Sequence, residues 1–124
     1  MRELKFRAWD KQEKQMMKVS AISLENKEIG VKDFRTYHFF RIKNIELMQY
    51  TGLKDKNGTE IYEGDVVKVE GDGEIYRVEW IYSGFGLEPR YNSPHYPILG
   101  NVKLRKKIEV IGNIHENPEL LERK

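Results

Sequence analysis

The side chains that could do chemistry in this sequence are few, and three histidines are the first to consider. His38, His95 and His115 lie far apart in the chain, and none stands in a metal-binding spacing such as HExxH. The chain has no cysteine, which excludes disulfides, thiolate metal sites and cysteine nucleophiles. No P-loop, dinucleotide-binding or GxSxG sequence is present either. We therefore expect neither a metal nor a cofactor.

Four carboxylates lie close together near the middle of the chain: Asp55, Glu60, Glu63 and Asp65. Two carboxylates held in one pocket can act as general acid and general base. Acidic residues in turns are more often solvated or bonded to nearby backbone amides. A small enzyme that uses Glu63 or Asp65 is therefore the alternative to a protein without catalytic activity.

A second group of residues is basic and aromatic. Lys5, Arg7 and Trp9 alternate along one segment, so they share a face if that segment is a strand. Rings can stack on bases while Lys and Arg bind phosphates, so the pattern indicates a nucleic-acid-binding face. The alternative is an edge strand guarded by charge, with Trp9 buried against a neighbour. Residues 35–43 extend the group with Arg35, Tyr37, His38, Arg41 and Lys43.

The central segment 47–69, LMQYTGLKDKNGTEIYEGDVVKV, is rich in residues that form turns. Asn57-Gly58 is a strong hairpin signal, because both residues tolerate a positive φ at low cost. We expect a structural role for the segment, in which glycines supply turns, tyrosines pack and an aspartate bonds to nearby backbone amides. The residues with these expected roles are Tyr50, Gly52, Asn57, Gly58, Tyr62, Gly64 and Asp65.

The segments that carry these side chains are predicted to be mostly strands. Residues 3–9 alternate between apolar and polar, which predicts a half-buried strand, and residues 16–24 predict its hairpin partner. Residues 25–33 are polar and include a glycine, which indicates a loop. Residues 34–48 are rich in aromatic and β-branched side chains, so they fit a strand better than a helix.

The C-terminal half has the spacing of strands and turns that is typical of a small barrel. Over residues 61–114, a Gly-Asp turn leads into a Val-rich strand, a hairpin, a long loop and a closing strand. The long loop, residues 88–100, contains three prolines. Asn117 and Pro118 then resemble the N-cap and first residue of a short helical turn.

The predicted fold is therefore mostly β, in two parts that could form one compact unit. An N-terminal β subdomain with a hairpin layer spans residues 1–46. A small SH3-like barrel, with the helical turn at its end, spans residues 47–124. A chain of 124 residues suffices for one domain or two small subdomains.

Charge is unevenly distributed along the chain, although the net charge is only +2. Residues 1–43 carry eleven Lys/Arg and six Asp/Glu, whereas residues 44–100 carry five and ten. Either the N-terminal third faces an anion such as nucleic acid, or oppositely charged segments contact each other. The N-terminus lacks the apolar run of a signal peptide, and no uncharged stretch approaches the ~20 residues of a membrane span. We therefore expect a cytoplasmic protein without a membrane partner.

Three segments of the sequence resemble the YopX family of phage and prophage proteins. They are KFRAWDKQEKQM at residues 5–16, the central segment at residues 47–69, and EVIGNIHENPELL at residues 109–121. The resemblance implies a phage or prophage origin, an all-β fold and a location in a bacterial host cell. It transfers no catalytic or binding residue, because no activity is assigned to the family.

Together these observations predict a non-enzymatic binding module that acts on a host or phage macromolecule, either a protein or a nucleic acid. Affinity that falls steeply with salt would indicate nucleic acid, and this alternative is a nucleic-acid-binding small barrel. Another alternative is an oligomeric assembly protein, in which the aromatic strands of residues 34–45 pair between subunits.

Overall fold

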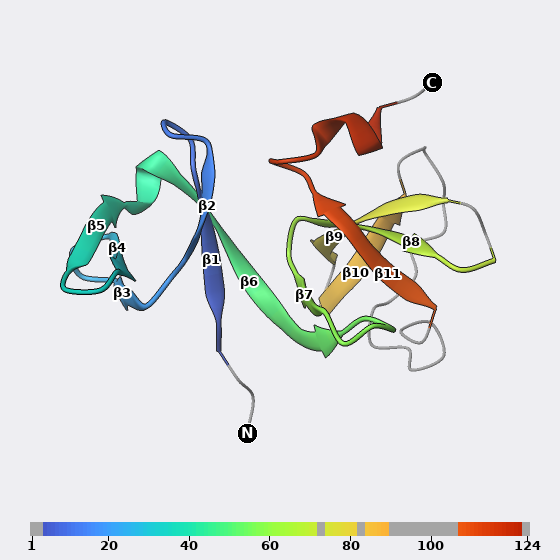
Figure 1. Cartoon of the computed structure of the whole chain (residues 1–124), viewed down its shortest axis with the longest axis horizontal. Helices are drawn as coiled ribbons and strands as arrows, with labels where there is room; N and C mark the ends of the chain where they lie inside the picture. Colours follow the sequence, from blue (N-terminus) through green and yellow to red (C-terminus); the bar gives the residue numbers. More distant parts are fainter. Residues whose placement is uncertain (1–3, 72–73, 82–83, 90–106, 123–124) are drawn as a thin grey trace. The chain divides into compact units, whose positions relative to one another are not determined.

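The computed structural model describes residues 4–71, 74–81, 84–89 and 107–122. Antiparallel strands dominate these residues, with two short 3₁₀ turns, so the protein is mostly β as the sequence predicts (Figure 1). Residues 90–100 of the predicted proline-containing loop lie outside the described residues. None of the helices within the described part is long and apolar enough to cross a membrane.

The chain divides into two compact units, residues 1–50 (unit 1) and residues 51–124 (unit 2). The boundary between the units falls inside the long strand β6 (Ile45–Lys54). The sequence-based boundary after residue 46 lies near the start of the same strand. Each unit has its own cluster of buried apolar side chains.

The first sheet of unit 1 begins with the predicted N-terminal hairpin, which is confirmed. Strand β1 (Phe6–Asp10) pairs with β2 (Gln15–Lys18) on one side and with β6 on the other. Strict alternation along β1 places Ala8 in the core, fully buried. The hairpin turn is held by Asp10, whose Oδ1 accepts the backbone N–H groups of residues 12 and 13.

The second sheet of unit 1 has the order β3-β4-β5 and consists of β3 (Ala21–Ser23), β4 (Glu28–Lys32) and β5 (Tyr37–Arg41). The prediction of a loop over residues 25–33 is wrong, because β4 is the central strand of this sheet. Its Ile29 is fully buried. The segment looks polar in composition only because its other face carries charged side chains and a glycine.

The predicted single strand over residues 16–24 is also corrected. It is divided between β2 and β3, which belong to different sheets, with a break at Val19 and Ser20. The backbone N–H of Ser20 already bonds to Gly30 of β4, so the chain changes pairing partner at this point. The apolar residues on the two sides of the break still share one core. It contains Ala8, Met17, Ile29 and Ile45, with Val19, Ile22, Val31, Phe40, Ile42 and Leu47 packed against it.

Unit 2 contains a four-stranded antiparallel sheet and a short strand that pairs with β6. The sheet has the order β10-β9-β8-β11. The core of unit 2 consists of Ile61, Val67, Val69, Tyr76, Val78, Leu87 and Ile108. The elements are β7 (Glu60–Tyr62), β8 (Asp65–Val69), β9 (Ile75–Ile81), β10 (Gly84–Pro89), β11 (Ile108–Asn113) and the 3₁₀ turn η2 (Pro118–Leu121).

The hairpin between β6 and β7 forms where Asn57-Gly58 predicts it, but its geometry differs from the expectation. Only Gly58 has a positive φ, of 83°, and Asn57 does not. The turn is closed by the N–H of Gly58 on the carbonyl of Asp55, and by the N–H of Asp55 on the carbonyl of Thr59. A type I turn followed by a left-handed glycine matches this pattern, and it requires positive φ at one residue only.

Gly52 also departs from its expected role as a turn residue. It lies inside β6 with a φ of 85°, a conformation that L side chains rarely adopt. The preceding residue, Thr51, is buried, and its Oγ1 donates to the carbonyl of Ile61 at 2.7 Å. Gly52 therefore marks a break in the regular strand conformation of β6. The break lies next to Thr51, which bonds to β7.

The C-terminal helical turn is present as η2, with Pro118 at its start, but Asn117 does not cap it through its side chain. Instead, Asn117 Oδ1 accepts the backbone N–H of Asn113 at 3.2 Å. The side chain of Asn117 lies so close to Gly112 that a Cβ there would be 2.5 Å from its Oδ1. A side chain at 112 would therefore force Asn117 to move from its position beside Asn113.

Candidate functional site

The outer face of the β3-β4-β5 sheet carries two aromatic rings that are open to solvent. Tyr37 and Phe39 point to the same side of β5 and are 43% and 65% exposed. Their rings stack with a centroid distance of 6.1 Å and an interplanar angle of 20°. We call Tyr37 and Phe39 the aromatic pair.

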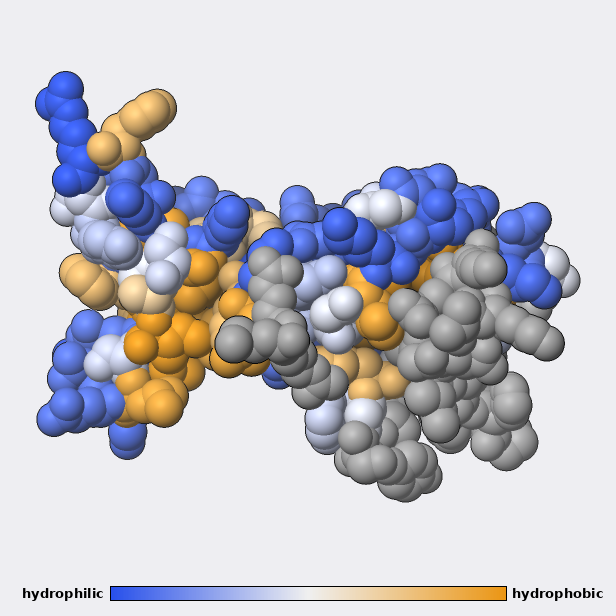
Figure 2. Space-filling model, turned by 90° about the horizontal axis from the view of Figure 1, so that it is seen from below, coloured by the Kyte–Doolittle hydropathy of each residue, from blue (hydrophilic) through white to orange (hydrophobic). Residues whose placement is uncertain are grey.

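The aromatic pair rests on small residues of the two neighbouring strands. Gly30 of β4 lies opposite Phe39, and Ala21 of β3 lies opposite Gly30. A Cβ at Gly30 would be 3.2 Å from Tyr37 and 3.4 Å from both Ala21 and Phe39. Glycine therefore lets both rings approach the backbone of β4, and a side chain at this position would have to displace them. In Figure 2, hydrophobic residues gather on the visible surface of unit 1.

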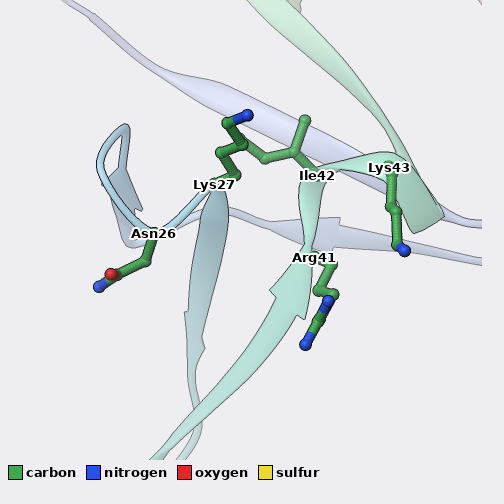
Figure 3. A pocket seen from close by; sticks show the side chains of 5 residues that line it. All are labelled: Asn26, Lys27, Arg41, Ile42 and Lys43. Carbon is green, nitrogen blue, oxygen red and sulfur yellow. The ribbon is translucent and has the colours of Figure 1, made fainter.

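A pocket of about 380 Å³ opens at the C-terminal end of β5, where the chain enters the 3₁₀ turn η1 (Ile42–Asn44). The pocket lies between the β3–β4 turn and the end of β5. These two segments are held together by the N–H of Ile42, which bonds to the carbonyl of Lys27 at 2.9 Å. We call its basic residues Lys27, Arg41 and Lys43 the basic rim. Figure 3 shows the five lining residues, which are Asn26, Lys27, Arg41, Ile42 and Lys43.

The cationic groups of the basic rim do not converge on one point. In Figure 3 the Lys27 side chain runs toward Ile42, and its amino group points away from the Arg41 guanidinium. Arg41 and Lys43 point to a common side but end apart from each other. Such a rim can meet several separate negative charges better than it can enclose one small anion.

Apart from Tyr37 and His38, the basic and aromatic group that the sequence indicates has six members, and these fall into two groups. Arg41 and Lys43 belong to the basic rim, and Arg35 lies in the turn that precedes β5. Lys5, Arg7 and Trp9 lie in and next to β1, in the other sheet of unit 1, and the described pocket that holds Arg41 includes none of them. Lys5 places its amino group 5.4 Å from the centre of the Tyr50 ring, and Arg7 lies opposite Lys18 and Met48.

Sequence reasoning missed Asn26 and Lys27 of the pocket and the outward direction of Phe39. The missed signal was the alternation of Ile29 and Val31 with Gly30, which identifies β4 and thereby the turn before it. Lys27 ends that turn with a φ of 55°. Without β4, neither the pocket nor the open face of β5 can be inferred.

Asp33 holds the turn at the other end of β5. Its Oδ1 accepts the N–H groups of Arg35 and Thr36, and its Oδ2 accepts a hydrogen bond from His38 Nε2 at 2.5 Å. The backbone N–H of Arg35, the side chain of His38 and the N–H of Thr36 together lower the pKa of Asp33 from 3.8 to about 2. At neutral pH the Asp33 carboxylate is therefore charged, and it is engaged in these three hydrogen bonds.

This lowered pKa predicts an acid-sensitive turn. The unfolded chain binds a proton at Asp33 more readily than the folded chain, so the contribution of Asp33 to stability is complete above about pH 4. It is lost as the pH falls toward about 2. A carbon-detected NMR titration of the Asp33 carboxyl group should give a midpoint near 2, and His38→Ala should raise it. A midpoint at 3.8 in the folded protein would contradict the prediction.

Two of the four carboxylates of the central segment, Asp55 and Asp65, accept hydrogen bonds from backbone amides. Asp55 is buried, and its Oδ1 accepts the N–H groups of Asn57 and Thr59, while its Oδ2 accepts that of Val110 at 2.9 Å. Asp65 is buried as well, and its Oδ2 accepts the N–H of Tyr62 at 2.7 Å. Within the described residues, no group of three or more His, Asp or Glu could hold a metal ion.

Unit 2 also has a pocket with lysines, but carboxylates line it too. It measures about 360 Å³, and Lys56 Nζ lies 3.5 Å from Glu109 Oε2 at its edge. Over the whole sequence, unit 1 carries eleven basic and seven acidic residues, and unit 2 carries eleven and thirteen. A polyanion would therefore meet a more favourable charge balance on unit 1.

Comparison with known proteins places this architecture in a family. The model of the YopX protein family matches residues 5–122. The crystal structure of protein EF1440 from Enterococcus faecalis is similar with a TM-score of 0.66 and 31% identity, covering 98% of this chain and 100% of that one. The crystal structure of protein yopX from Bacillus subtilis is similar with a TM-score of 0.66 and 24% identity, covering 97% of each chain. A comparison with curated proteins gives no match. The chain therefore belongs to the YopX family.

Proposed function

We propose that this chain is a non-enzymatic binding module that holds a host or phage macromolecule against the outer face of β3-β4-β5. The observation that carries the proposal is the aromatic pair, two stacked rings left open to solvent on an edge strand. Burying one such side chain contributes about 1.5–3 kcal/mol, so a partner that covers the rings gains this free energy on binding. Exposed apolar patches of this kind mark interaction sites.

The absence of catalysis is part of the same proposal. Asp65, which the enzyme alternative would use, is buried and accepts a backbone N–H, as does its neighbour in the central segment, Asp55. Carboxylates in such positions hold turns in place. Turnover of a substrate by the pure protein, lost in Glu63→Gln, would overturn this part of the proposal.

Family membership and the spacing of the strands support two further parts of the proposal. We propose that the protein acts in a phage or prophage context, in the cytoplasm of a bacterial host. We also propose that residues 47–124 form an SH3-like barrel. The antiparallel order β10-β9-β8-β11 with closely spaced turns supports this.

The test is a capture experiment with the tagged protein in host lysate, run with and without nuclease. Wild-type protein should retain a partner, and Phe39→Ser should lose it, because the serine removes one ring of the aromatic pair. The matched control is Trp80→Ser, which removes a ring of unit 2 that is 53% exposed. Phe39→Ser protein that retains every partner would show that the aromatic pair is not the contact.

Assembly through β5 is a second candidate function, favoured by the position of this strand at the end of the sheet order β3-β4-β5. The bonds from Asp33 N–H to Thr36 and from Ile42 N–H to Lys27 set the pairing of β4 with β5. In an antiparallel pair of strands, hydrogen-bonded and non-hydrogen-bonded residue pairs alternate, so Gly30 and Phe39 form a non-hydrogen-bonded pair. The N–H of Phe39 therefore points away from β4, where a second copy of the chain could accept it. Light scattering at high concentration should then show dimers, and Phe39→Pro should abolish them. A monomeric mass throughout would exclude this candidate.

A further inference from the structure

We infer that the partner of the outer face is single-stranded nucleic acid, an inference that rests on the proposed function and names the partner's class. Its first support is the arrangement of the rings. Tyr37 and Phe39 are alternate residues of one strand and lie side by side with nearly parallel planes. Exposed aromatic residues on the sheet of RNA-binding modules stack two or three bases in this way.

The second support is the basic rim at the end of the same strand. Arg41 follows Phe39 on the same face of β5, so the rim begins where the aromatic pair ends. None of the five residues that line the rim's pocket is acidic. Arg41 and Lys43 point to a common side and end apart from each other, so these two cationic groups suit successive phosphates of an extended chain (Figure 3).

Acidic residues near this face are few and reduce its charge only in part. Glu28 lies opposite Arg41 on β4, and Asp33 is held by His38 and two backbone amides. Lys32, opposite Tyr37, adds a basic residue to the same face. The mixture predicts binding of moderate strength that depends on both stacking and charge.

A single strand fits these features and a duplex does not. Bases within a duplex are stacked on each other, so their flat faces are not available to protein rings. The five residues of β5 span about 17 Å, which leaves room for a few nucleotides along the aromatic pair and the basic rim.

The experiment is fluorescence anisotropy of labelled oligo(dT) and oligo(U) of about 12 nucleotides, a length within the ~4–16 nucleotides that single-strand-binding modules cover. The full chain should bind at least one of these probes and bind a duplex of equal length more weakly. The logarithm of the affinity should fall with the logarithm of the salt concentration, with a slope of about −1.4 for the two phosphate contacts of Arg41 and Lys43.

Variants separate the two supports of the inference. Phe39→Ser should weaken binding about tenfold or more by removing one stacking ring. Arg41→Gln and Lys43→Gln should each reduce the salt slope by about 0.7. The matched control is Lys68→Gln, an exposed lysine of unit 2, which should leave both affinity and slope unchanged.

Three outcomes would overturn the inference: no binding of either probe, equal binding of the duplex, or binding that Phe39→Ser does not weaken. If probes fail while a nuclease-resistant partner is captured in a Phe39-dependent manner, the partner is a protein. The proposed function then stands without this inference. If neither probes nor lysate partners depend on Phe39, both fail together.

Discussion

Asp55→Ala is expected to lower the free energy of unfolding of unit 2 by about 3 kcal/mol. One buried carboxylate here accepts three backbone N–H groups, two within its own hairpin and one from Val110 of β11. Hydrogen bonds to charged groups contribute about 1.5–3 kcal/mol each, and alanine leaves all three amides without this acceptor. Asp55 thereby joins a local turn to a strand that is 55 positions away in the chain.

The measurement is urea unfolding followed by tryptophan fluorescence in a Trp9→Phe background, so that Trp80 reports on unit 2 alone. Asp55→Asn should also destabilise the unit, because its amide turns one accepting oxygen into a donor that faces a backbone N–H. Lys54→Ala, an exposed neighbour, should change the free energy by less than about 0.5 kcal/mol. A loss below about 1 kcal/mol in Asp55→Ala would show that water replaces the carboxylate.

Ile29→Ala is expected to cost unit 1 about 2–5 kcal/mol. The Ile29 side chain is fully buried in the cluster that joins the two sheets of unit 1. Removing three carbons leaves a cavity there, which adds to the lost transfer energy. A unit of 50 residues has little stability to lose, so the β3-β4-β5 sheet should be largely unfolded.

This expectation is tested with Trp80→Phe as background, so that Trp9 reports on unit 1. Hydrogen exchange of the amides of β4 and β5 should also accelerate, because local opening becomes easier. Ile29→Val should cost only about 0.5–1.5 kcal/mol, and Phe39→Ala, at an exposed ring, close to nothing. Unchanged protection in β4 would mean that this sheet does not depend on the cluster.

The family resemblance also gains a physical explanation from the structure. Asp10, Thr51, Asp55, Asp65 and Asn113 are the buried polar or charged residues of the described part of the chain. All five lie in the three segments that carry the resemblance, at residues 5–16, 47–69 and 109–121. Four of them accept backbone N–H groups in or near turns, namely Asp10, Asp55, Asp65 and Asn113. The fifth, Thr51, donates to a carbonyl of β7. The buried polar residues of these three segments therefore have a structural role in the turns and strands of the fold.

Local sequence patterns suffice to predict the class of fold and the place of most strands. A side-chain period of two and turn-forming residues act within a few positions, so the N-terminal hairpin and the turn at Gly58 follow from local chemistry. The same local patterns misled at residues 25–33. There, a strand buried on one face only, with Gly30 on the other, has the composition of a loop.

Which basic residues lie together depends on the pairing of segments that are separated in the chain. Lys27 and Lys43 share a pocket because β4 pairs with β5 and the N–H of Ile42 bonds to Lys27, whereas Lys5 packs on the ring of Tyr50. Pairing between segments depends on how both sheets bury one common core, and no local pattern encodes that choice. The exposure of Phe39 follows from the same pairing, because it sets Gly30 beneath the ring and leaves β5 at the edge of the sheet.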